Sequence, residues 1–292
     1  MEKLEFTPLI IIGAGRSGTN ILRDTLTKLP DFRTWPCDEI NPIWRHGNLN
    51  YPSDEIPVEN AAPAVISSIR KAFIRIWRSS GQPHYVVEKT CANSLRVDFV
   101  DTVLPEARYI HILRDGMDVV SSARKRWNGE MEVASFNYFL TKARYSPLFD
   151  LPVYAFTALK NRLSVKLGLS RHLETWGPKF EGMDNCQEAT VEELAARQWA
   201  ACVNASAKSF AKMPESKVIF VRYEDLATNP VGVIANITDW LGIKYTSSQI
   251  SAATSDVRRE SVGKGQKLVD ELPEDVIEIL NSVKLSKGQI NQ

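Results

Sequence analysis

Short runs of hydrophobic residues recur along the chain, and each is followed by a stretch whose apolar positions have helical spacing. Four of these runs are predicted to be β-strands: Leu9–Ile12, Tyr85–Val87, Tyr109–Leu113 and Val218–Val221. Strands that alternate with helices are typical of a parallel sheet whose two faces are both covered. The pattern therefore predicts an α/β fold with an open parallel sheet flanked by helices.

Two longer segments complete this outline. Residues 128–190 interrupt the alternation with several prolines, glycines and aromatic residues, and we expect a mostly helical insertion that caps the sheet. Val191–Lys212 carries an apolar stripe at helical spacing, which predicts a helix packed on the core. No linker-like composition divides the 292 residues, of which 43% are hydrophobic, so we expect residues 1–292 to form a single domain.

Charge and cysteine content limit the possible partners. The formal net charge is only +1, so the protein as a whole is not expected to recruit nucleic acid, and any basic site must be local. The apolar run near the N-terminus is too short for a signal peptide or a membrane span, which predicts a cytoplasmic protein without a transmembrane segment. The four cysteines show no CxxC spacing, so neither a zinc site nor a disulfide framework is expected.

The segment Gly13–Asn20 combines a glycine-rich turn with the start of a helix, directly after the first strand. Glycines allow backbone N–H groups to point inward around an anion, and the helix N-terminus adds partial positive charge. The glycine spacing is P-loop-like, but Thr19 stands where a nucleotide triphosphatase has lysine, and Asn20 replaces the hydroxyl that binds magnesium. The loop carries its cation at Arg16 instead, which favours an anion bound without a metal.

A second strand, turn and helix begin at Arg114. Ser122 and Arg126 lie four residues apart on the helix that follows and therefore share one of its faces. Two guanidinium groups and a hydroxyl that converge from a strand end and a helix would form a phosphate clamp. The alternatives are an ion pair between Arg114 and the nearby Asp115 or Asp118, and a solvated position for Arg126.

These motifs resemble those of the family of sulfotransferases that use 3′-phosphoadenosine 5′-phosphosulfate (PAPS), and among them most closely the tyrosylprotein sulfotransferases. The second strand, the fourth strand and the C-terminal region also resemble the family, at Glu88-Lys89-Thr90, at Arg222–Leu226 and at Ser261–Lys267. The resemblance implies PAPS as donor, 3′-phosphoadenosine 5′-phosphate (PAP) as product, and these donor-binding residues: Gly15, Arg16, Ser17, Gly18, Thr19, Asn20, Arg114, Ser122, Arg126, Tyr223, Gly263, Lys264 and Lys267. The chain departs from the pattern at Asn20, where a second threonine is usual, and in the insertion at 128–190.

The catalytic groups follow from the resemblance and from an analogy with in-line phosphoryl transfer. Arg16 and Lys89 are expected to stabilise the leaving 5′-phosphate. The acceptor hydroxyl needs a general base, and the family uses a histidine or a glutamate. Glu39 is the preferred candidate. Asp38 is its nearer rival because the alignment needs a gap in this segment, and His46 is the third.

The acceptor is expected to be a carbohydrate hydroxyl, because the insertion is rich in aromatic residues that could cover sugar faces. A tyrosyl peptide, a phenol or another small metabolite are the alternatives within the same reaction. A small-molecule kinase is disfavoured by the absence of lysine after Gly18. A non-catalytic nucleotide-binding scaffold on the same fold is the remaining alternative, and turnover would separate it from an enzyme.

Overall fold

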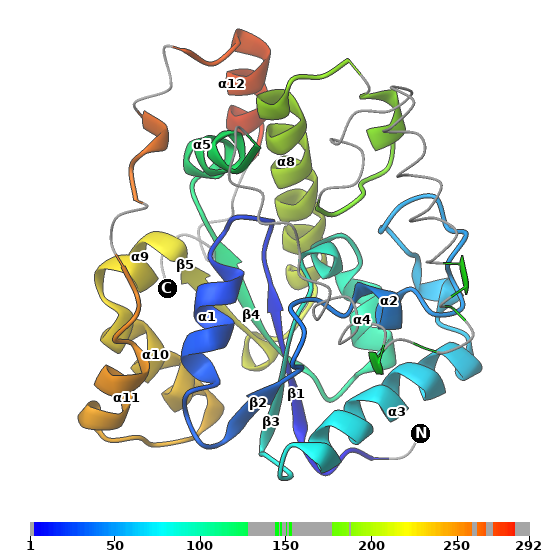
Figure 1. The fold of residues 1–292 in the computed structure, drawn as a ribbon, viewed down its shortest axis with the longest axis vertical. Coiled ribbons are helices and arrows are strands. Elements are labelled where there is room, and N and C mark those ends of the chain that lie inside the picture. Colours follow the sequence, from blue (N-terminus) through cyan, green and yellow to red (C-terminus); the bar gives the residue numbers. More distant parts are fainter. Residues whose placement is uncertain are drawn as a thin grey trace.

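A five-stranded parallel sheet with the strand order β2-β3-β1-β4-β5 forms the centre of the molecule (Figure 1). The computed structural model describes residues 3–127, 144–145, 147, 150, 152–153, 177–186, 188–258, 262–266 and 271–283. The strands are β1 (Thr7–Ile12), β2 (Phe32–Thr34), β3 (Tyr85–Lys89), β4 (Arg108–Leu113) and β5 (Val218–Arg222).

Helices follow each strand and connect it to the next. The α-helices are α1 (Thr19–Leu26), α2 (Asn41–Trp44), α3 (Pro63–Ser79), α4 (Val97–Val103), α5 (Gly116–Trp127), α8 (Val191–Phe210), α9 (Tyr223–Thr228), α10 (Pro230–Leu241), α11 (Ser247–Ala253) and α12 (Glu274–Asn281). Short 3₁₀ helices are η1 (Val58–Asn60), η2 (Cys91–Leu95), η5 (Met183–Asn185) and η6 (Glu215–Lys217). Within the described part of the chain, no helix has both the length and the apolar character that a membrane crossing requires.

The predicted α/β fold with a helix-flanked parallel sheet is confirmed, and all four predicted strands are present. The edge strand β2 was not predicted. It has only three residues and pairs in parallel with β3, with Phe32 opposite Tyr85. A strand this short cannot show a periodic pattern in the sequence, so its existence depends on its neighbour. Most of the predicted helical insertion at 128–190 lies outside the described residues.

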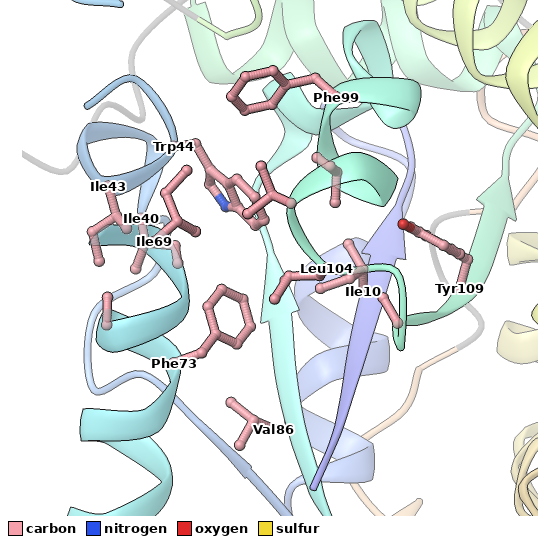
Figure 2. Close-up of a cluster of buried hydrophobic side chains, with 14 of the residues drawn as sticks. Ile10, Ile40, Ile43, Trp44, Ile69, Phe73, Val86, Phe99, Leu104 and Tyr109 are labelled. Atoms are coloured by element: carbon pink, nitrogen blue, oxygen red, sulfur yellow. The ribbon is translucent and has the colours of Figure 1, made fainter. Parts of the chain in front are cut away.

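Alternate side chains of the central strand β1 point to opposite faces of the sheet and belong to two separate hydrophobic clusters. Ile10 and Ile12 pack with α2, α3 and α4, whereas Leu9 and Ile11 pack with α1, α9, α10 and α11. Figure 2 shows the first cluster, in which Trp44 and Phe73 lie between the helices and the strands. Because both faces are covered by apolar side chains, β1 is a continuous buried run rather than an alternating one.

A third hydrophobic cluster joins α5, α8 and α12 at the end of the sheet where the strands finish (Figure 1). The helix predicted over Val191–Lys212 is observed as α8, two residues shorter, and its apolar stripe is buried as expected. Its N-terminus is capped by Thr190, whose side chain accepts a hydrogen bond from the backbone N–H of Glu193 at 3.1 Å. α8 also contacts the loop that follows β4, because Nε1 of Trp199 donates to the carbonyl of Arg114 at 3.2 Å.

Strand register places the loops of three strands at one edge of the sheet. Ile11 of β1 is opposite Lys89 of β3, and Ile12 is opposite His111 of β4. In a parallel sheet all carboxyl ends lie on the same edge, where ligands of open α/β folds bind. The phosphate-loop candidate after β1 therefore lies between Lys89 and the loop that begins at Arg114.

Candidate active site

The turn after β1 adopts a backbone that few side chains tolerate. Arg16 has a φ angle of +67° and Gly18 one of +85°, both in the left-handed region. The N–H of Ser17 donates to the carbonyl of Ala14 at 3.2 Å, and α1 begins at Thr19. A non-glycine residue held with a positive φ is strained, and such strain is often found at binding sites. The turn thus has the compact form expected of an anion-binding loop.

Arg16 connects this loop with the helix after β4. Its Nε donates to the Oγ of Ser122 at 3.0 Å, while its own carbonyl accepts a hydrogen bond from the Arg114 guanidinium at 2.7 Å. The two segments that the sequence proposed as separate anion sites are therefore in direct contact. Both arginines are largely withdrawn from solvent, and Arg114 is only 8% exposed.

Tyr223, the first residue of α9, lies between the phosphate loop and Arg114. The Arg114 guanidinium carbon is 4.3 Å from the centroid of the Tyr223 ring, a cation–π contact. A Cβ atom added at Gly18 would lie 2.2 Å from Cδ2 of the same ring. Glycine is therefore required at position 18 both by its φ angle and by the close approach of Tyr223.

Lys89, the last residue of β3, carries a buried ammonium held between two carboxylates. Its Nζ is 3.1 Å from Asp38 and 3.0 Å from Glu39, and its side chain is 2% exposed. Glu39 also accepts the backbone N–H of Cys91 at 3.3 Å, and Asp38 accepts Arg23 at 2.6 Å. Asp38 and Glu39, the two acidic candidates for the general base, thus both contact Lys89 but differ in their second partner.

The pKa values of these groups follow from their partners. Burial alone would lower the pKa of Lys89, but the acidic groups around it, Cys91, Glu39 and Asp38, raise that pKa above its ordinary value. Burial works to raise the pKa of Asp38, but Lys89 and Arg23 outweigh it, so that this pKa is lowered. Lys89 is therefore a permanent cation at neutral pH. Asp38, which two cations hold, is a weaker proton acceptor than an ordinary aspartate.

These side chains surround one cavity of about 400 Å³ at the carboxyl ends of the strands. It is lined by Gly15, Arg16, Gly18, Thr19, Asn20, Ile21, Asp38, Glu39, Lys89, Cys91, Arg114, Ser122, Gly177, Pro178 and Tyr223. Three of the lining residues are cations and two are acids. Within the described ranges, no group of three or more His, Cys, Asp or Glu side chains is arranged to hold a metal ion.

The C-terminal loop is attached to the start of α5 by Asp118. Its carboxylate accepts the backbone N–H of Gly263 at 2.8 Å and that of Gly265 at 2.6 Å, and it lies 3.9 Å from the Arg114 guanidinium. A Cβ atom at Gly265 would be 2.3 Å from the backbone of Met117, so the loop packs tightly against this helix. The alternative ion pair of Arg114 with Asp118 is thus present, but it is long, and Asp118 mainly holds the loop.

The predicted site residues separate into three groups. Most of them line the cavity described above. Ser17 is buried beside the cavity without lining it, and Gly263 and Lys264 lie in the loop that Asp118 holds. The side chain of Arg126 and all of Lys267 fall outside the described residues. His46, the third candidate base, pairs with Asp150 at 2.7 Å and does not line this cavity.

Some lining or supporting residues were not foreseen. Gly177 and Pro178 form part of the wall because the carbonyl of Pro178 accepts the side-chain amide of Gln198 at 2.9 Å, a contact between residues with no shared motif. Asp118 was named from the sequence only as a possible ion-pair partner of Arg114, and its hydrogen bonds to the distant Gly263 and Gly265 leave no local pattern. Cys91 follows the Glu88-Lys89-Thr90 match and also lines the cavity, although the sequence indicated no role for it in the site. Burial, followed by the charge of Glu39, raises the pKa of Cys91 to about 12, so it stays a thiol.

A model of the sulfotransferase family matches residues 8–151 and 165–247, which is most of the chain. The chain therefore belongs to the sulfotransferase family, and the protein is an enzyme of the transferase class. No protein in the curated collections matches at a significant level.

Solved structures of sulfotransferases share the fold. The sulfotransferase domain from the curacin biosynthetic pathway is 13% identical, with a TM-score of 0.52 over 99% of this chain and 96% of that one. The sulfotransferase domain from the Synechococcus PCC 7002 olefin synthase is 14% identical, with a TM-score of 0.54 over 98% of both chains. Sulfotransferase STF9 from Mycobacterium avium is 11% identical, with a TM-score of 0.50 over 97% of this chain and 78% of that one.

We expect Gly18→Ala to destabilise the enzyme, because alanine at a positive φ costs about 1–2 kcal/mol and its Cβ would also displace the Tyr223 ring. Urea unfolding should show a decrease of at least about 2 kcal/mol in the free energy of unfolding. Gly15→Ala is the matched control, since a Cβ at Gly15 meets no atom within 4 Å. Equal stability of the two variants would contradict the packing of Tyr223 on Gly18.

Proposed function

We propose that the enzyme binds PAPS in this cavity without a metal and transfers its sulfuryl group to a hydroxyl of the acceptor, with Glu39 as general base. The observation that carries the proposal is the arrangement around Lys89. This buried cation lies beside the phosphate loop and also contacts the candidate base. Donor and acceptor sides of the reaction therefore meet at one side chain.

The residues of the cavity fit a donor with two separate phosphate groups. The loop N–H groups, Arg16 and Lys89 would hold the 5′-phosphosulfate, whereas Arg114 and Ser122 would hold the 3′-phosphate. Tyr223, packed on Gly18 and on Arg114, is suited to a ring contact with the nucleoside. The volume of the cavity, about 400 Å³, falls in the range usual for small-molecule sites.

Three side chains carry the proposed chemistry. Bound PAPS supplies an activated sulfur, whose bond to the acceptor oxygen forms as its bond to the 5′-phosphate oxygen breaks. Glu39 removes the proton of the acceptor hydroxyl, and Lys89 with Arg16 stabilises the negative charge left on the phosphate. Because the pKa of Lys89 is raised, this stabilisation does not titrate near neutral pH.

Glu39 is a better candidate for the base than Asp38. Asp38 is held by both Lys89 and Arg23, which lower its pKa despite its burial and so weaken it as a base. Among the charged side chains, Glu39 contacts one cation, Lys89, and its other contact is a backbone N–H.

We propose a carbohydrate hydroxyl as acceptor, with a tyrosyl peptide or a phenol as the alternatives. The carbohydrate proposal is based on the aromatic residues between positions 128 and 190. Of these, Tyr145 and Phe180 are described, and they pack against the first and the third hydrophobic cluster, respectively. The motif resemblance to tyrosylprotein sulfotransferases favours the peptide alternative.

Donor binding should require both phosphates but no metal. Calorimetry should show tight binding of PAP that persists in EDTA and much weaker binding of adenosine 5′-monophosphate. Arg114→Ala should weaken PAP binding by at least about tenfold, because a charged hydrogen bond is lost, and should affect the monophosphate far less. Loss of PAP binding in EDTA, or equal binding of the two nucleotides, would contradict a metal-free two-phosphate site.

Glu39→Gln should lower the turnover of radiolabelled PAPS by about 10²-fold or more and leave PAP affinity near normal, since a general base contributes on that scale. Asp38→Asn is the matched variant, because it removes the neighbouring charge that also contacts Lys89, and it should lower turnover less. If the Asp38 variant were the more impaired of the two, Asp38 would be the base.

The acceptor class can be tested with radiolabelled PAPS against a panel of saccharides, phenols and tyrosyl peptides. We expect label on saccharides. Glu39→Gln in parallel reactions controls for label that transfers without the proposed base. Efficient labelling of phenols or peptides, with none on saccharides, would overturn the carbohydrate proposal and leave the family assignment intact.

A further inference from the structure

Thr90 lies directly behind the catalytic candidates and reaches the loop that carries them. It follows Lys89, and its side chain is fully buried. Its hydroxyl donates to Oε1 of Glu88 at 2.5 Å and accepts the backbone N–H of Ile40 at 3.2 Å. Ile40 is the residue after Glu39. A single hydroxyl thus connects the end of β3 with the segment that bears both acids.

The partner of Thr90 is itself held in place. Glu88 is 1% exposed, and its second oxygen accepts the Asn93 side-chain amide at 2.9 Å. Burial, only partly offset by the hydrogen bond from Thr90, raises the pKa of Glu88 to about 7. Neither Glu88 nor Thr90 lines the cavity. A buried carboxyl with two side-chain donors forms a fixed support rather than a group that reaches the ligand.

The hydrogen bonds around Glu88 and Asn93 also reach the segment of Asp38 and Glu39 at a second point, Asn41. The Oδ1 of Asn93 accepts Nε of Arg96 at 2.9 Å, and Arg96 donates to the side chain of Asn41 at 2.5 Å. Ile40 and Asn41 are therefore both attached to the segment Glu88–Arg96. The preceding residues, Trp35–Glu39, belong to neither a helix nor a strand. Their positions consequently depend on the packing of Trp35 and Cys37 in the first hydrophobic cluster and on such side-chain attachments, rather than on a ladder of backbone bonds.

We propose that Thr90 is a positioning residue for the reaction: its hydroxyl holds the Ile40 backbone so that the carboxylates of Glu39 and Asp38 meet Lys89. This proposal rests on the proposed function, since it requires that a carboxylate of this loop acts as the base. Loss of the hydroxyl removes the acceptor of the buried Ile40 N–H and one of the two side-chain donors to Glu88, which favours displacement of the loop. A displacement of about 1 Å at a catalytic group can reduce turnover about 10²-fold.

Thr90→Val tests the proposal, because valine has nearly the same shape without the hydroxyl, and Thr90→Ser, which keeps it, is the matched control. In the enzyme without ligand, hydrogen exchange of a peptide containing Ile40 should become at least about fivefold faster in the valine variant and return toward normal in the serine variant. Exchange in the phosphate loop should not change. Unchanged exchange at Ile40, or equal acceleration in both segments, would overturn the proposal.

Turnover distinguishes a positioning role from a general loss of structure. With radiolabelled PAPS and either the acceptor panel or water alone, Thr90→Val should lower turnover at least about tenfold, with PAP affinity unchanged. In the Glu39→Gln background the same substitution should have little further effect, because Thr90 acts through that carboxylate. An equal loss in both backgrounds, or full activity of the valine variant, would contradict the proposal.

Two further comparisons cover the cases in which Glu39 is not the base or Thr90→Val does not fold. If Glu39→Gln were fully active, the base assignment would fail, and the Thr90 comparison would be made in the Asp38→Asn background instead. If Thr90→Val did not fold, Thr90→Cys would replace it, since a thiol of similar size is only a weak hydrogen-bonding group. The same exchange and turnover outcomes then support or overturn the role of Thr90.

Discussion

Parallel pairing of β1 with both β3 and β4 is the constraint on which the site depends. It aligns the ends of three strands, so that the loop after Ile12 is placed between Lys89 and Arg114. The residues concerned are far apart in the sequence, yet the backbone hydrogen bonds of the sheet fix their separation. Apolar packing on both faces of β1 then makes this alignment costly to change.

Arg16, Lys89 and Arg114 lie around one cavity, where their charges repel one another. Contacts with neighbouring groups offset this repulsion. Lys89 is paired with two carboxylates, Arg114 lies on the Tyr223 ring and donates to the loop backbone, and Arg16 donates to Ser122. Each cation is thereby held in a defined orientation. An arriving anion meets donors that are already positioned, which lowers the reorganisation that binding and transfer require.

The sequence predicts the cavity residues that follow a strand but not those that come from distant segments, for a physical reason. Arg16, Lys89, Arg114 and Tyr223 each follow a strand within a few residues, so a correct prediction of the strands also locates them. Gly177 and Pro178 reach the cavity only through contacts with distant residues such as Gln198, which leave no local pattern. The edge strand β2 escaped prediction for the same reason, because its pairing with β3 is what defines it.

The cavity wall formed by Gly177 and Pro178 is held in place by Asp54. Asp54 accepts Arg45 at 2.9 Å and Arg96 at 3.3 Å, and its other oxygen accepts the backbone N–H of Lys179, next to Pro178. Burial works to raise the pKa of Asp54, but Arg96, the Lys179 amide and Arg45 outweigh it and lower that pKa.

A carboxyl with a lowered pKa stabilises the fold at every pH above its unfolded value, ordinarily 3.8, and this stabilisation is lost only as the pH falls through the lower folded value. The wall that Asp54 holds is therefore intact throughout the neutral range. The shape of the cavity beside Pro178 thus does not depend on the titration of Asp54 near neutral pH.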